Sequence, residues 1–252
     1  MKDNKLTYRP FNGLFYAITV GYAVVYALLS LLLVRLDMQT RKYIIIGISI
    51  FVIICYFIYK YQLSKDEEYD ELYYSKVGGF TWWYEMPLHL CNINMFLVLF
   101  GILFDSRYVQ GFAFFIGPVG AMMAILMPSG PFNNCSILKP RMLGYYFTHF
   151  CITFNCILLC TAGIYMPEYS DVIPIVVVGI ILSFIIFCFN MVLRKTGIAI
   201  KANYFYTVEP EENKVLMFFN NYIKYPYLYL IPLFVLFIPY MYLVTFIVKL
   251  FE

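Results

Sequence analysis

Two histidines and one cysteine are the residues of this sequence that are best suited to chemistry in an apolar setting. His89 and His149 are its two histidines, and both stand in long apolar runs, as does Cys91. Ionisable side chains inside membrane helices are costly and usually face the interior of a bundle, so each histidine is a candidate functional residue. The alternative is that a histidine in such a run only makes a polar contact between helices.

A thiol and an imidazole together can perform nucleophilic catalysis. The imidazole takes the proton of the thiol near neutral pH, and the thiolate that results is a strong nucleophile. Attack on a fatty acyl ester would give a thioester, which the hydroxyl of a second lipid could resolve, with no metal and no cofactor. The competing interpretation is that Cys91 is simply a small hydrophobic residue, as most membrane cysteines are.

Helical spacing favours His149 over His89 as the partner of Cys91. At about 100° per residue, Cys91 points about 200° away from His89 on the same helix. If that helix extends back to Glu85, one face carries Glu85, His89 and Asn92, and the face of Cys91 carries Asn94 and Met95. The helix dipole would help a thiolate at Cys91 only slightly, because its influence fades beyond the first turn.

The second histidine belongs to a regular stripe on its own expected helix. Both histidine-bearing helices are expected to begin on the same side of the membrane, so the two imidazoles lie in one leaflet. His149 lies about 10 Å along its helix. The stripe consists of Tyr145, His149, Thr153, Cys156 and Cys160.

The composition requires a membrane protein. Hydrophobic residues make up 62% of the 252 residues and charged residues only 13%, which a soluble fold of this size cannot accommodate. The net charge of +3 is too weak to indicate nucleic-acid binding. Six of the seven cysteines lie in apolar runs, so no disulfide framework is expected, and no spacing indicates a structural zinc site.

Seven apolar stretches are long enough to cross a bilayer as helices, which takes about 20 residues each. The sequence therefore predicts an all-α, polytopic membrane bundle that forms a single domain over residues 1–252. The first stretch is a helix and not a signal peptide, because no small-residue cleavage site follows it. The expected spans are 14–34, 43–60, 86–104, 109–127, 142–164, 172–194 and 226–248.

The fourth span, 109–127, is interrupted by Gly111, Gly117, Pro118 and Gly120. Broken helices are tolerated where neighbouring helices satisfy the backbone. Its small residues, spaced four apart, favour close packing against other helices.

Basic residues are divided unequally between the two sides of the membrane. Thirteen of the 18 lysines and arginines fall on the side of the N-terminus and five on the other. The positive-inside bias predicts a cytoplasmic N-terminus and an outer C-terminus in the plasma membrane. Two inner loops stand out: 61–85 carries the acidic run 66–71, interpreted as solvated, and 195–225 carries Asn203 and Tyr204.

Several short motifs, in order, resemble the YwaF family of bacterial integral membrane proteins. They are the run Pro87-Leu88-His89-Leu90-Cys91-Asn92, the glycine-rich segment from Phe115 to Pro128, the segment Tyr145–Phe150 around His149, and Asn203-Tyr204 followed by Pro210. They cover about residues 80 to 230. The acidic run 66–71 and the aromatic residues near the C-terminus have no place in that pattern.

The resemblance implies an acyltransferase, because the family is related to an animal transmembrane enzyme that remodels ether phospholipids through a cysteine and a histidine. It assigns the nucleophile to Cys91 and the base to His149, with membrane phospholipids as substrates. Six further residues are candidates for orienting or binding the lipid, with Arg141 also interpretable as an interfacial anchor: Glu85, His89, Asn94, Arg141, Asn203 and Tyr204.

Two other classes of function stay open at this point. Water in place of the acceptor lipid would make the protein a lipid hydrolase or thioesterase. A transporter or small-ligand receptor would use the histidines and the broken helix to line a polar cavity. A zinc ion held by His89, Cys91 and His149 is disfavoured, because the first two diverge on their helix.

Overall fold

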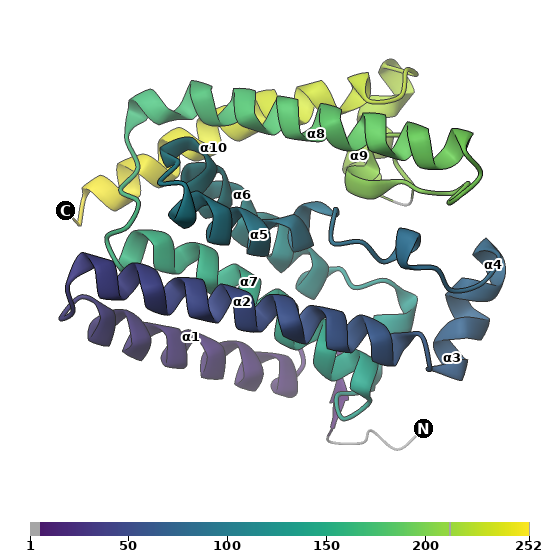
Figure 1. Cartoon of the computed structure of the whole chain (residues 1–252), viewed down its shortest axis with the longest axis horizontal. Helices are drawn as coiled ribbons and strands as arrows, with labels where there is room; N and C mark the ends of the chain where they lie inside the picture. The colour runs from purple at the N-terminus through teal and green to yellow at the C-terminus, as the bar shows by residue number, and fades with distance from the viewer. Residues whose placement is uncertain (1–5, 212, 252) are drawn as a thin grey trace.

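The computed structural model describes residues 6–211 and 213–251, and most of these residues are helical. Seven long apolar helices run back and forth along one direction (Figure 1). They are α1 (Gly13–Leu33), α2 (Met38–Leu63), α5 (Leu90–Leu103), α6 (Arg107–Leu126), α7 (Pro140–Thr161), α8 (Val172–Lys195) and α10 (Ile231–Lys249). The all-α membrane bundle predicted from the sequence is confirmed.

Six of these helices are long and apolar enough to cross a membrane, and α5 is the shorter exception among the described residues. Its 14 residues rise about 21 Å, less than the roughly 30 Å of a hydrocarbon core. The glycine-rich α6 is a continuous helix of 20 residues despite Pro118. The first helix, α1, begins at one end of the bundle and the last, α10, ends at the other (Figure 1).

The short elements lie in the connections. They comprise α3 (Glu67–Tyr69), η1 (Asp70–Tyr74), α4 (Ser75–Val77), η2 (Trp82–Tyr84), η3 (Gly130–Phe132), η4 (Tyr169–Asp171), η5 (Tyr204–Tyr206), α9 (Lys214–Tyr222) and η6 (Leu228–Leu230). Two strands of two residues each, β1 (Thr7–Tyr8) and β2 (Cys135–Ser136), pair antiparallel. This pairing fastens the start of α1 to the loop that precedes α7.

Side-chain caps and basic residues define the helix ends. Asn12 accepts a hydrogen bond from the Phe15 backbone at 2.8 Å and begins α1, and Asp37 caps α2 in the same way. Arg41 closes the turn between the two helices, since its guanidinium donates to three carbonyl oxygens, including that of Ala162 after α7. Helices α1, α2 and α7 are therefore tied together at that end of the bundle.

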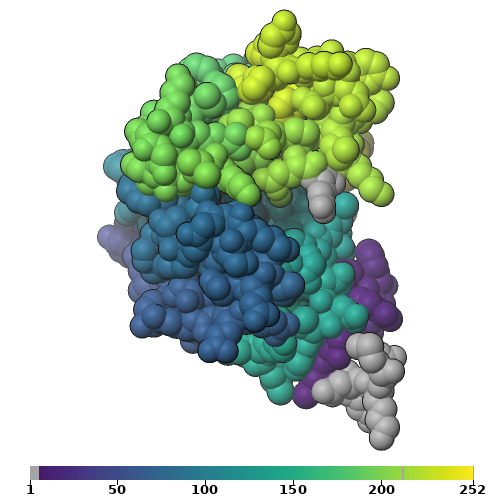
Figure 2. Space-filling view, turned by 90° about the vertical axis from the view of Figure 1, so that its right-hand side faces the viewer, coloured from purple at the N-terminus to yellow at the C-terminus, as the bar shows by residue number. Residues whose placement is uncertain are grey.

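Among the six helices long enough to cross a membrane, α6 and α7 are the most buried, and α1 and α10 are the least. The polar core lies toward the end where α2 and α8 finish and α5 and α7 begin. Figure 2 views that end, which is covered by the segment after α2 (blue) and by the chain that links α8 to α10 (green to yellow). These two segments are far apart in the sequence, and both approach Cys91.

Candidate active site

Cys91 lies in the first turn of α5, because the helix begins at Leu90 and not at residue 86 as predicted. Pro87 disfavours a helical conformation at Met86, and His89 is extended with φ −70° and ψ 150°, so the chain enters the helix through an irregular turn. The helix does not extend back to Glu85, so the common face of Glu85, His89 and Asn92 that such an extension would give is not formed, and His89 is the N-cap. The expectation that the dipole would help a thiolate only slightly assumed an earlier helix start; with α5 beginning at Leu90, Cys91 lies in the first turn, where the influence of the dipole is largest.

Glycines of α6 allow it to pack directly against this helix start. A β-carbon on Gly120 would come within 3.2 Å of the Leu90 side chain and 3.5 Å of the Cys91 backbone nitrogen. One turn earlier, a β-carbon on Gly117 would lie 3.3 Å from the Asn94 amide and collide with Cys156 of α7. The close packing predicted from the small-residue spacing is confirmed, and it brings α5, α6 and α7 together.

His149 has one ring nitrogen engaged by its own helix. Its Nδ1 lies 2.7 Å from the carbonyl oxygen of Tyr145, and because a carbonyl only accepts, Nδ1 must carry the proton. The lone pair is then on Nε2, as a general base requires. The ring of Tyr145 packs on the imidazole at 4.3 Å, and Thr153 donates to the His149 carbonyl at 2.9 Å. Tyr145, His149 and Thr153 of the predicted stripe therefore contact one another along the helix.

Cys91 and His149 belong to one neighbourhood but do not touch. The hydroxyl of Tyr145, whose ring covers His149, is within electrostatic range of the Cys91 thiol. His89 is within electrostatic range of His149. No hydrogen bond joins Cys91 to His149 in the part of the chain that the structure describes. Proton transfer between them requires a closer approach, which catalytic groups commonly reach only with substrate bound.

The loop with Asn203 and Tyr204 holds the segment that leads into Cys91. The Tyr204 hydroxyl donates to the Trp83 carbonyl at 2.6 Å and accepts from the Met86 backbone at 3.0 Å. The ring of His89 packs edge-on against Tyr204 at 5.1 Å. Asn203 stabilises its own loop, with hydrogen bonds to the backbone of Val208 and Glu209.

Asn190 is a buried polar residue that the sequence pattern did not single out as part of the site. Its amide donates to the Tyr204 carbonyl at 2.8 Å and accepts from the Tyr204 backbone nitrogen at 3.1 Å. It also donates to Thr207 at 2.8 Å. An isolated amide inside the apolar run of α8 was the available signal. Asn190 therefore holds Tyr204 in place, and Tyr204 in turn holds the backbone of Trp83 and Met86, which lead into Cys91.

Glu85 forms a buried ion pair with Lys60 of α2. Lys60 is a second residue of the site that the sequence pattern did not single out. Lys60 Nζ lies 2.5 Å from Glu85 Oε2, and the two side chains are 12% and 5% exposed. Tyr74 donates to the other carboxylate oxygen at 2.9 Å, and Tyr56 donates to the Glu85 backbone carbonyl at 2.9 Å. The predicted span 43–60 ends at Lys60, and a lysine at the end of a span is normally interpreted as a cation at the membrane interface. In the structure α2 continues to Leu63, so Lys60 lies within the helix.

Arg141 is almost fully buried and is paired with the acidic run after α2. Its guanidinium lies 3.0 Å from Asp66 and 2.7 Å from Glu68, and Lys139 also pairs with Glu68. Hydrogen bonds from Arg141 and Lys139 lower the pKa of Glu68 to about 2. The acidic run is largely solvated, as interpreted from the sequence, since Glu68 is 51% exposed, but Asp66 is only 22% exposed and both carboxylates pair with Arg141 of α7.

Two buried amides near the start of α5 have acceptor oxygens without a partner. Asn94 donates to the Leu90 carbonyl at 2.5 Å, while its Oδ1 accepts no hydrogen bond from any described residue. The Oδ1 of Asn92 is also buried and accepts no hydrogen bond from any described residue. Such oxygens are available to a donor group on a substrate or to water.

The seven cysteines are free thiols. Among the described residues, no group of three or more histidine, cysteine or acidic side chains is arranged to hold a metal ion. The chemistry to be explained is therefore that of a thiol, two imidazoles, a buried ion pair and unpaired amides.

Comparison with known proteins identifies the family of this chain. No curated protein matches the sequence, and no solved structure does. A model of the TMEM164 family matches residues 8–245, which include all seven long helices nearly to their last turn and every residue of the candidate site. Over nearly its whole length, the chain belongs to the TMEM164 family.

Proposed function

We propose that the protein is an integral membrane acyltransferase that moves a fatty acyl chain between membrane phospholipids through a thioester on Cys91. The observation that carries this proposal is the position of Cys91, in the first turn of a short helix and in the same polar neighbourhood as His149. Membership of the TMEM164 family supports acyl transfer on lipids, the activity that the YwaF resemblance implied. We regard the whole chain as one domain of this enzyme.

The first half-reaction forms the thioester. His149 Nε2 takes the proton of the Cys91 thiol, and the sulfur attacks the ester carbonyl carbon of the donor phospholipid. The C–S bond forms, the ester C–O bond breaks, and the departing oxygen takes the proton from His149. The dipole of α5 stabilises the thiolate while it forms.

The second half-reaction returns the enzyme to its starting state. The hydroxyl of an acceptor lipid gives its proton to His149, and its oxygen attacks the thioester carbonyl carbon. The C–O bond forms, the C–S bond breaks, and the Cys91 thiolate takes the proton back from His149. Asn94, with its unpaired oxygen beside this helix start, is suited to orienting the acceptor hydroxyl.

The other candidate residues receive supporting roles. Tyr204 and His89 hold the turn before Cys91, Asn203 holds the loop that carries Tyr204, and Glu85 anchors the same turn to α2. Arg141 reaches a lipid phosphate only by releasing Glu68, since the two are now paired. The excess of basic residues on this side supports a site at the cytoplasmic leaflet of the plasma membrane.

The test is transfer of an isotope-labelled acyl chain from a phospholipid to a lysophospholipid by purified protein in liposomes. Cys91→Ala and Cys91→Ser should reduce the labelled product by at least about 100-fold, as removal of a nucleophile does. Cys188→Ala is the matched control, because Cys188 is an exposed thiol on α8, and it should retain the activity. Equal transfer by Cys91→Ala would contradict the proposal, and labelled free fatty acid as the sole product would make the enzyme a hydrolase.

A further inference from the structure

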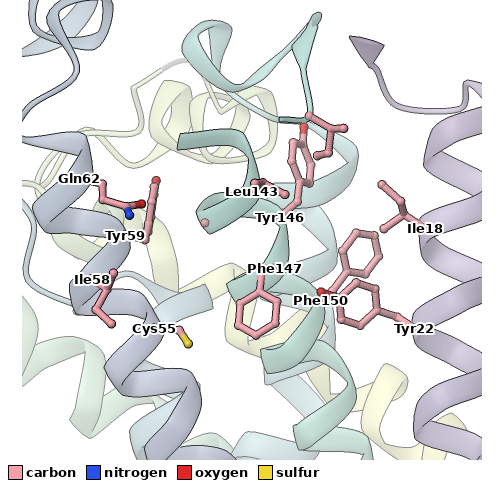
Figure 3. A pocket seen from close by; sticks show the side chains of 12 residues that line it. Ile18, Tyr22, Cys55, Ile58, Tyr59, Gln62, Leu143, Tyr146, Phe147 and Phe150 are labelled. Atoms are coloured by element: carbon pink, nitrogen blue, oxygen red, sulfur yellow. The ribbon is translucent and has the colours of Figure 1, made fainter. Parts of the chain in front are cut away.

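A groove of about 440 Å³ lies between α1, α2 and α7, on the side of α7 away from His149. Figure 3 shows its walls: Ile18 and Tyr22 come from α1, Ile58 from α2, and Phe147 and Phe150 from α7. The volume is within the usual range of sites for small ligands. Its surface is almost entirely apolar, so the chemistry of the walls fits a hydrocarbon chain.

The groove opens toward the lipid. Ile58 and Leu143 line it and are 52% and 48% exposed, and exposed apolar side chains of membrane helices face acyl chains. Gln62 lies at the end near the loops, and Cys55 lies seven residues deeper on α2, about 10 Å away along the helix. A chain that entered between α1 and α2 would therefore run along the membrane normal with its polar end near Gln62.

Tyr59 connects this groove to the candidate active site. Its side chain passes α7 where that helix carries Gly144, and a β-carbon on Gly144 would come within 2.5 Å of the tyrosine ring. Beyond this point the Tyr59 hydroxyl is buried without a hydrogen-bond partner among the described residues. It is within electrostatic range of both Cys91 and Glu85. One side chain thus lines the groove and carries a buried, unpaired hydroxyl in the same neighbourhood as the thiol.

We infer that the groove between α1, α2 and α7 binds the fatty acyl chain of the lipid substrate, and that the Tyr59 hydroxyl donates a hydrogen bond to the acyl carbonyl oxygen. The inference rests on the proposed acyl transfer. As the Cys91 sulfur bonds to the carbonyl carbon, negative charge develops on the oxygen and strengthens this hydrogen bond. Tyr59 keeps its proton throughout, and the bond relaxes when the C–O bond of the leaving group breaks.

Photocrosslinking tests the groove independently of the chemistry. The probe is a phospholipid with a diazirine in the middle of one acyl chain, incorporated with the Cys91→Ala protein into phosphatidylcholine liposomes. We expect crosslinks to Ile58 and Phe147, and at least about a fivefold loss of them in Ile58→Trp, which fills the groove. Ile54→Trp is the matched control, because Ile54 is one turn away on α2 and is equally exposed at 52% but does not line the groove.

Kinetics test the hydrogen bond. Tyr59→Phe should lower kcat by about 100-fold or more with little change in KM, as loss of one such donor does in other enzymes. Tyr61→Phe is the matched control, because Tyr61 is also a tyrosine of α2 but is 58% exposed and does not line the groove, and it should leave kcat unchanged. An unchanged kcat in Tyr59→Phe would overturn the role of the hydroxyl.

The results separate this inference from the proposed function. Crosslinks in the groove together with no acyl transfer by the wild-type protein would retain the groove and reject the acyltransferase. Acyl transfer with crosslinks spread evenly over lipid-facing helices would retain the acyltransferase and reject the groove.

Discussion

Lys60 and Glu85 form an ion pair that is nearly removed from solvent, and it determines how the chain approaches Cys91. Lys60 of α2 and Tyr74 of η1 each bind one oxygen of the carboxylate, and Cys91 follows Glu85 by only six positions. Removing one partner of such a pair leaves a buried charge uncompensated, which costs more than the pair itself contributes.

Lys60→Met should therefore destabilise the protein by about 3–5 kcal/mol, measured as the free energy of unfolding in a denaturant titration in mild detergent. Lys42→Met is the control, since Lys42 pairs with an aspartate that is 77% exposed and should change stability by at most about 1 kcal/mol. The double variant Lys60→Met, Glu85→Leu should recover part of the loss. Equal stability of the wild type and Lys60→Met would contradict the importance of this pair.

The Glu68 carboxylate gives a pH-dependent prediction. Its folded pKa of about 2 is below the ordinary value of 4.5, so its contribution to stability is complete above pH 4.5 and disappears as the pH falls toward 2. Wild type should unfold at a higher temperature than Glu68→Gln at pH 6, and the difference should shrink steadily between pH 4.5 and pH 2. A difference in unfolding temperature that does not change with pH would show that the charge of Glu68 in its ion pairs with Arg141 and Lys139 does not stabilise the protein.

At the scale of elements, contact among α5, α6 and α7 depends on glycines at defined positions. A methyl group at Gly117 would collide with Cys156 in the tightly packed centre of the bundle. Gly117→Ala should destabilise the protein by about 1–3 kcal/mol and lower the activity, because α5 carries Cys91. Gly47→Ala is the matched control: Gly47 is also in a helix but has open space around it, so stability should stay equal or rise.

The collision at Gly117 also predicts rescue. Cys156→Ala removes the sulfur that the new methyl group would meet, so the double variant should be more stable than Gly117→Ala alone. Additive losses in the double variant, measured by the same denaturant titration, would contradict direct contact as the cause.

The helices were predictable from the sequence because each depends on its own run of apolar residues. The centres of all seven were placed well, and the stripe through His149 followed from helical spacing alone. The start of α5 was misplaced because hydropathy does not register the local effect of Pro87. The contacts of Lys60 with Glu85, of Asn190 with Tyr204, and of Tyr59 with Gly144 join residues 14 to 85 positions apart, and no local pattern encodes such pairs.

At the scale of the molecule, seven helices place the start of α1 and the end of α10 at opposite ends of the bundle (Figure 1). The excess of basic residues predicts that the end with the candidate site faces the cytoplasm. Lys201→Cys, in the loop after α8, should react with a membrane-impermeant maleimide only after cells are permeabilised. Arg35→Cys, between α1 and α2, should react in intact cells, and the reverse pattern would contradict the orientation.

The central claim is that Cys91 carries the acyl group. Purified protein in liposomes with a fatty acyl phospholipid should gain the mass of one acyl chain, and hydroxylamine should remove it, as it removes thioesters. The adduct should be absent in Cys91→Ala, should form more slowly in His149→Ala, and should be retained in Cys188→Ala. No adduct with any of several donor lipids, or an adduct that persists in Cys91→Ala, would contradict the account.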